Sequence, residues 1–118
     1  MLRGLLNGDK KVMKKIYVSV PMRDMFEDEI ARRQEKLLEL AGEYLHEPVM
    51  LIETFIKSEK YNALECLGEG IKRMADADYV LLSDGWENGR RSTIEMACAL
   101  KYNKKKLLEQ YNKIEEVV

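Results

Sequence analysis

Short apolar runs alternate with stretches of helical periodicity along most of this chain, and this alternation restricts the fold more than any other feature. The runs are rich in β-branched and aromatic residues, which favour strands, whereas the stretches between them repeat apolar residues every three or four positions. The expected strands cover residues 15–20, 49–52, 77–83 and 106–108. The expected helices cover residues 24–45, 64–74 and 92–102. Strands that are separated by helices pair in parallel through crossovers, so this order predicts a parallel sheet.

The predicted fold is therefore α/β. We expect a three-layer sandwich of the flavodoxin or Rossmann-like kind, with a mostly parallel sheet of four to five strands between helical layers. The segments 15–20 and 79–83 are nearly continuous in apolar character, which is typical of central strands covered on both faces. Residues 110–118 are expected to add a helical turn or two.

The N-terminal segment 1–12 shows neither helical nor strand periodicity. We interpret it as a flexible extension, with Met13 as an alternative start. The remaining residues, 13–118, are of the size of one domain.

The composition indicates a globular protein without a strongly charged partner. Of the 118 residues, 46% are hydrophobic and 35% are charged, which is enough apolar material for a core. The formal net charge of −1 gives no field that would attract a nucleic acid polymer or an anionic membrane. Because no stretch has the length of a membrane span and no signal peptide is recognisable, we expect a cytoplasmic protein.

The sequence offers no obvious metal or disulfide chemistry. Cys66 and Cys98 lie in apolar, helix-like surroundings, which favours free thiols in a reducing compartment. The one histidine, His46, lies near a predicted helix end and leaves no histidine–cysteine cluster for zinc. We expect no metal and no organic cofactor.

The stretch 84–95, DGWENGRRSTIE, follows the most apolar strand and leads into a helix. Ligands of open parallel sheets bind outside the carboxyl ends of the strands, so this stretch is a candidate site. Its glutamate, Glu95, would be a substrate-facing carboxylate there. Ser92 and Glu95 also fit a capping box, in which Ser92 is the N-cap and Glu95 bonds back to its amide. The residues alone leave both interpretations open.

Neighbouring residues of this stretch are candidates for substrate binding. Trp86, the only tryptophan, would stack on a planar ring of a ligand or cover the end of the sheet. Asp84 would accept a hydrogen bond from a ligand hydroxyl or only begin a turn with Gly85. Arg90 and Arg91 would clamp a phosphate or belong to a solvated loop.

The end of the first strand contributes further candidates. Ser19, Met22 and Arg23 would hold a phosphate or a sugar hydroxyl, although Arg23 also has acidic neighbours with which to pair. Tyr17 lies in the middle of the same strand, where tyrosine is usually a core residue.

Four segments, taken in order, resemble one protein family. They are KIYVSVPMRD at the first strand, LGEGIKRMADADYVLL from the second helix into the third strand, DGWENGRRSTIE after it, and ACALKYNKK in the third helix. The chain resembles a small bacterial and phage domain family of unknown function in the nucleoside 2-deoxyribosyltransferase-like superfamily. The resemblance extends over about residues 13–108 and implies the same α/β fold.

For function, the resemblance implies hydrolysis or transfer at the N-glycosidic bond of a nucleoside or nucleotide. Glu95 matches the glutamate nucleophile, and Tyr17 matches a tyrosine beside it in some members. The superfamily also implies a homodimer or larger assembly. This chain departs from the pattern at Arg91-Ser92, where a glycine and a small residue are usual, and at Glu69-Gly70, where an aspartate is frequent. A non-catalytic nucleotide-binding or sensing module and a ligand-free interaction protein are the alternatives.

Overall fold

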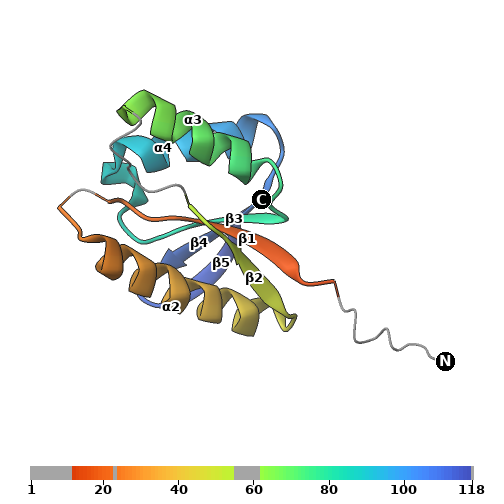
Figure 1. Ribbon diagram of the computed structural model, residues 1–118. Coiled ribbons are helices and arrows are strands. Elements are labelled where there is room, and N and C mark those ends of the chain that lie inside the picture. The colour runs from red at the N-terminus through yellow and green to blue at the C-terminus, as the bar shows by residue number, and fades with distance from the viewer. Residues whose placement is uncertain (1–11, 23, 55–61, 118) are drawn as a thin grey trace.

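One five-stranded sheet forms the centre of the protein (Figure 1). The computed structural model describes residues 12–22, 24–54 and 62–117, so the segment 1–11 of the expected extension lies outside the described residues. The strands are β1 (Lys14–Ser19), β2 (Val49–Ile52), β3 (Tyr79–Leu82), β4 (Lys105–Gln110) and β5 (Lys113–Val117), and their order in the sheet is β2-β1-β3-β4-β5. The helical elements are α2 (Glu27–Leu45), α3 (Ala63–Met74), the 3₁₀ turn η1 (Trp86–Asn88) and α4 (Arg90–Lys101).

The sheet is mixed rather than wholly parallel. The four strands expected from the sequence pair in parallel, and β1 and β3 are interior strands as expected. The fifth strand pairs antiparallel with β4, so the expected helical turns after residue 110 are wrong. Tyr111 and Asn112 connect the two strands with φ values of 52° and 62°. Positive φ at both residues is typical of the type I′ turn that joins antiparallel strands.

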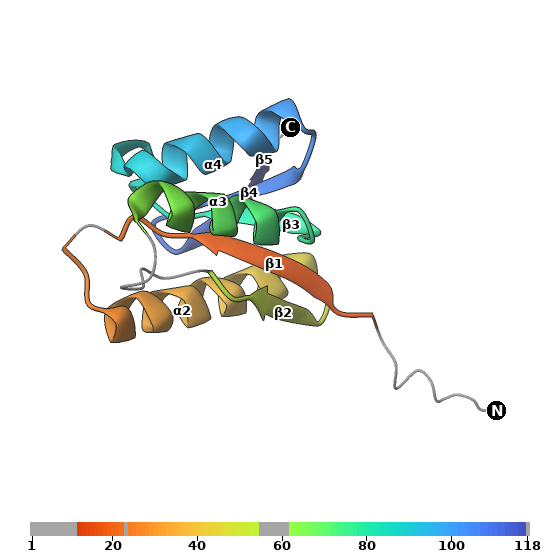
Figure 2. The same ribbon diagram turned by 45° about the horizontal axis from the view of Figure 1, so that its top comes forward.

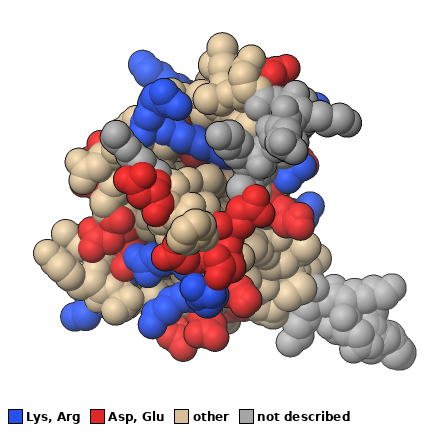
Figure 3. All heavy atoms as spheres, turned by 60° about the vertical axis from the view of Figure 1, so that its left-hand side comes forward, with Lys and Arg blue, Asp and Glu red and all other residues tan. Residues whose placement is uncertain are grey.

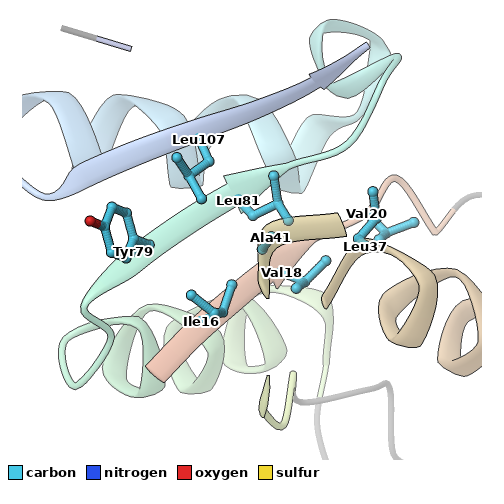
Figure 4. Close-up of a cluster of buried hydrophobic side chains, with 8 residues drawn as sticks. All are labelled: Ile16, Val18, Val20, Leu37, Ala41, Tyr79, Leu81 and Leu107. Atoms are coloured by element: carbon cyan, nitrogen blue, oxygen red, sulfur yellow. The ribbon is translucent and has the colours of Figure 1, made fainter. Parts of the chain in front are cut away.

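Helices cover both faces of the sheet, with α2 on one side and α3 and α4 on the other (Figures 1 and 2). Alternate residues of a strand point to opposite faces. Ile16 and Val18 of β1 therefore pack with Leu37 and Ala41 of α2 (Figure 4). Tyr17, between them, packs on the other side of the sheet with the cluster beneath α3 and α4. Burying each large apolar side chain contributes roughly 1.5–3 kcal/mol, so the two clusters hold the three layers together.

Helix α4 begins two residues before the position that the sequence suggested. Its N-cap is Gly89, whose backbone is extended with φ −97°, and the amide of Thr93 donates to the Gly89 carbonyl at 3.0 Å. Ser92 and Glu95 are consequently the third and sixth helical residues, so the capping-box interpretation is wrong. A capping box occurs instead at α3, where Asn62 and Glu65 each accept a hydrogen bond from the other's amide at 2.9 Å.

Two further features bear on the sequence-based expectations. Cys66 and Cys98 are both free thiols. Within the described part of the chain, every helix lacks either the length or the apolar character needed to cross a membrane.

Candidate functional site

The buried carboxylate of Glu95 is the centre of a polar network between β1 and α4. The Tyr17 hydroxyl donates to Glu95 Oε2 at 2.5 Å. Ser19 Oγ lies 2.6 Å from Glu95 Oε1 and 2.9 Å from Ser92 Oγ. A hydroxyl has one proton, so Ser19 donates to the carboxylate while Ser92 donates to Ser19. Only 1% of Glu95 is exposed, so these hydrogen bonds replace the water that the carboxylate loses.

Arg91 adds a positive charge to this network. Its Nε donates to Glu95 Oε2 at 3.0 Å, and its Nη2 donates to the Tyr17 hydroxyl at 3.2 Å. Burial alone would lower the pKa of the Arg91 guanidinium, but the acidic groups of Tyr17 and Glu95 outweigh burial and raise it. Arg91 and Glu95 therefore form a charged pair, with a neutral tyrosine between them.

Tyr17 is held in its protonated form. Burial raises the pKa of its phenol, and the negative charge of Glu95 raises this pKa further, against the opposing effect of Arg91. A tyrosine of the unfolded chain ionises near pH 10. The folded protein binds the phenolic proton more strongly than the unfolded chain, so the resulting stabilisation is complete below pH 10 and is lost as the pH rises further.

Tyr17→Phe is therefore expected to become less destabilising in alkaline solution. Above pH 10 the gap in unfolding free energy between wild type and variant should shrink by about 1.4 kcal/mol per pH unit. Urea denaturation between pH 8 and about pH 11 measures this gap. Tyr102→Phe is the control substitution, because the Tyr102 side chain is largely exposed. A constant gap for Tyr17→Phe would contradict the buried phenol.

Gly70 of α3 lies so close to Tyr17 and Arg91 that a larger residue at this position would collide with them. A Cβ atom placed on Gly70 would lie 2.7 Å from the Tyr17 hydroxyl and closer still to the Arg91 guanidinium. The position matches the Glu69-Gly70 pair at which the superfamily resemblance implied an aspartate. Glu69 points elsewhere and pairs with Lys72 at 3.7 Å. Helix α3 thus contributes space, rather than a carboxylate, to the site.

Gly70→Ala is expected to destabilise the protein by roughly 1–3 kcal/mol, because overpacking must displace Tyr17 or Arg91. Gly68→Ala is the matched control on the same helix, where the added methyl meets nothing within 4 Å. Replacing an open helical glycine by alanine should stabilise by roughly 0.5–1 kcal/mol. Thermal and urea denaturation should give opposite signs for the two variants, and equal signs would exclude the close contact at Gly70.

Of the other residues predicted to form the site, only some belong to this network. Ser19 and Ser92 belong to it, as described. Met22 is half-buried in the turn after β1, where its carbonyl accepts from the Met25 amide at 3.2 Å. Arg23 lies outside the described residues, and Arg90 is exposed at the first position of α4. Of the candidates Arg90 and Arg91, Arg91 joins the network, and its i, i+4 spacing from Glu95 is itself a pairing signal in the sequence.

Asp84 and Trp86 lie farther along the same edge of the sheet. They line a hollow of about 410 Å³ between η1 and the β4–β5 turn, and neither Glu95 nor Tyr17 reaches its wall. A second hollow, of about 480 Å³, lies beside α2 and β2 and also excludes both residues. Gly85, with φ 86°, makes the turn between Asp84 and Trp86, as expected.

A buried carboxylate that the sequence did not reveal organises this neighbourhood. Glu109 Oε1 accepts from Arg33 Nη2 at 2.6 Å and from the Asp84 amide at 2.8 Å. Glu109 Oε2 accepts from the Asn112 amide at 3.0 Å. One side chain of β4 therefore fixes α2, the turn before η1 and the β4–β5 turn relative to one another.

The described residues contain no group of three or more histidine, cysteine, aspartate or glutamate side chains that could hold a metal ion. Comparison of this chain with protein-family models, curated proteins and solved structures finds no match. The site must therefore be interpreted from its own geometry.

Proposed function

We propose that this protein cleaves or exchanges the N-glycosidic bond of a nucleoside or nucleotide, with Glu95 as the nucleophile, on a fold of the nucleoside 2-deoxyribosyltransferase-like kind. The observation that carries the proposal is the contact of Tyr17 and Ser19 with opposite oxygens of a buried carboxylate. The carboxylate follows β3 in the chain and lies beside the carboxyl end of β1, the edge at which open parallel sheets bind ligands.

The arrangement suits attack on an anomeric carbon. An oxygen of Glu95 forms a bond to C1′ while the C1′–N bond to the base breaks, and the carboxylate charge stabilises the oxocarbenium-like transition state. Water, or a second base, then displaces the glutamyl oxygen. The overall hydrolysis consumes one water and releases the free base and the sugar. Tyr17 and Ser19 would keep the carboxylate oriented through both steps.

Arg91 would regulate access to this carboxylate. Glu95 is 1% exposed, whereas the Arg91 side chain is 21% exposed and reaches from the network towards the surface. A substrate that carries a phosphate competes with Glu95 for the guanidinium, because arginine binds carboxylate and phosphate with the same planar fork. Substrate binding would thereby loosen the Arg91–Glu95 pair and increase the nucleophilicity of the carboxylate.

A non-catalytic nucleotide-binding module is the second candidate. The Arg91–Glu95 pair favours it, because a carboxylate neutralised by arginine and closed to solvent is also a stable structural element.

Release of free base separates the two functions. The protein would be incubated with a panel of ribo- and deoxyribonucleosides and their 5′-monophosphates, and free base would be measured by chromatography. The proposed enzyme releases base from at least one compound. A protein that releases none, but whose melting temperature rises with one of these compounds, is the binding module.

We also propose a homodimer or larger homo-oligomer as the working state. Apolar side chains at the surface support it, among them Phe26 at the start of α2, which is 75% exposed, and Ile94 and Leu100 of α4. Light scattering at micromolar concentration should give at least twice the monomer mass of 13.8 kDa. Phe26→Ser should reduce that mass if Phe26 lies in the contact, and a monomeric wild type would contradict the proposal.

A further inference from the structure

We propose that the hollow between η1 and the β4–β5 turn binds a small organic cation, an amine or guanidinium compound with a short hydrocarbon body. The hollow has a volume of about 410 Å³. Sites for small molecules typically have volumes of about 300–1,000 Å³ and combine apolar walls with a few polar groups. Leu108 and Ile114 supply the apolar part of this wall.

Charge decides which kind of compound fits. Asp84, Glu87 and Glu115 line the hollow and are exposed, and none of the ion pairs in the described part of the chain involves them. Lys113 is the one cationic side chain in the wall. Glu109 also lines the hollow, but Arg33 offsets its charge. Figure 3, which shows the side of the molecule that lies at the left of Figure 1, has acidic side chains across its middle with basic side chains among and below them. The three carboxylates would attract a cation in the hollow and repel an anion.

Two aromatic rings in the wall of the hollow also favour a cationic compound. Trp86 and Tyr111 line the hollow from η1 and from the β4–β5 turn. The faces of such rings attract amines and guanidinium groups. Tyr111 has φ 52° and is 80% exposed. That backbone conformation favours asparagine or glycine over a bulky aromatic residue, so the chain keeps an exposed ring at the rim at a conformational cost.

This site is separate from the Glu95 network. Tyr17 lies on β1 and Leu108 on β4, with β3 between them. Two strand spacings place the positions about 10 Å apart across the sheet. The inference therefore does not depend on the proposed N-glycosidic chemistry, and its test does not use base release.

Two isosteric compounds test the charge requirement. Trp86 is the only tryptophan, so its fluorescence reports directly on the hollow. Titration with n-butylguanidinium should give a saturable change below about 10 mM, and n-butylurea, which has the same shape without the charge, should not. Raising the salt from about 0.05 to 0.5 M should weaken the binding of n-butylguanidinium at least about threefold.

Variants of residues in the wall of the hollow then show which side chains bind n-butylguanidinium. Asp84→Asn and Glu115→Gln should each weaken binding about threefold or more, because each removes one attracting charge. Glu116→Gln is the matched control, because Glu116 is an exposed carboxylate of the same strand that does not line the hollow. Tyr111→Asn should weaken binding while leaving the melting temperature unchanged or higher.

Three results would overturn the proposal. They are equal binding of n-butylurea, unchanged affinity in an Asp84→Asn/Glu115→Gln double variant, and no saturable response to n-butylguanidinium. If adenosine saturates the same fluorescence change and the double variant retains it, the hollow accepts a neutral ring instead of a cation.

Discussion

Glu95→Gln is expected to lower the rate of base release by about 10³-fold or more, because the amide keeps the shape of the side chain but lacks the attacking charge. It should also lower the unfolding free energy by roughly 1–3 kcal/mol. The amide oxygen can still accept from Tyr17, and Ser19 can turn its hydroxyl to accept from the amide nitrogen. Arg91, however, loses its charged partner. Base release measured well below the melting temperature separates the loss of chemistry from the loss of stability.

Glu69→Gln is the control for this experiment. Glu69 is a partly exposed carboxylate of α3 whose only ion pair in the described structure is with Lys72. Its replacement should change stability by less than about 0.5 kcal/mol and leave base release unchanged. If Glu95→Gln is as active as wild type, Glu95 is not the nucleophile.

Glu109→Ala is expected to be among the most destabilising single changes in this chain, at roughly 2–4 kcal/mol. It leaves the amides of Asp84 and Asn112 without their acceptor and removes the partner of Arg33. The Arg33 side chain is 29% exposed and can turn to water, so the two amides account for most of the loss. Urea denaturation gives the magnitude.

Glu116→Ala provides the matched control, because Glu116 is an exposed glutamate of the adjacent strand. Its effect should stay within about 0.5 kcal/mol. Glu109→Ala should additionally shift the fluorescence of Trp86, since the turn that carries Trp86 is fixed through Asp84. A stability loss equal to that of Glu116→Ala would show that Glu109 does not tie these elements together.

The sequence predicted the elements whose patterns are local and repeated. The apolar character of 79–83 predicted a buried strand, and the helical spacing in 64–74 predicted α3. The predicted start of α4 at Ser92 is two residues too late. Ser92 and Glu95 match the pattern of a capping box, but Gly89 is the N-cap and both side chains are buried. β5 was missed because Tyr111-Asn112 lacks the glycine that usually marks a two-residue turn.

Side-chain partners that are distant in sequence could not be predicted by pattern. The Tyr17–Glu95 contact was expected only through the family resemblance, since 78 residues separate the pair. Glu109 and Arg33 are 76 residues apart, and nothing in the sequence around either one marks it as part of a pair. These contacts depend on how β1 packs with α4 and how α2 packs with β4, which is decided after the elements form.

The two outer strands of the sheet differ in their resistance to aggregation. β5 ends one side with the sequence KIEEV, whose charged residues oppose pairing with a strand of another molecule. β2 ends the other side with VMLI, four apolar residues of which Met50 is exposed. Unpaired backbone groups on such a strand are a template for intermolecular pairing. If the protein aggregates on storage, association should begin at β2, and Met50→Lys should delay it without changing the melting temperature by more than a few degrees.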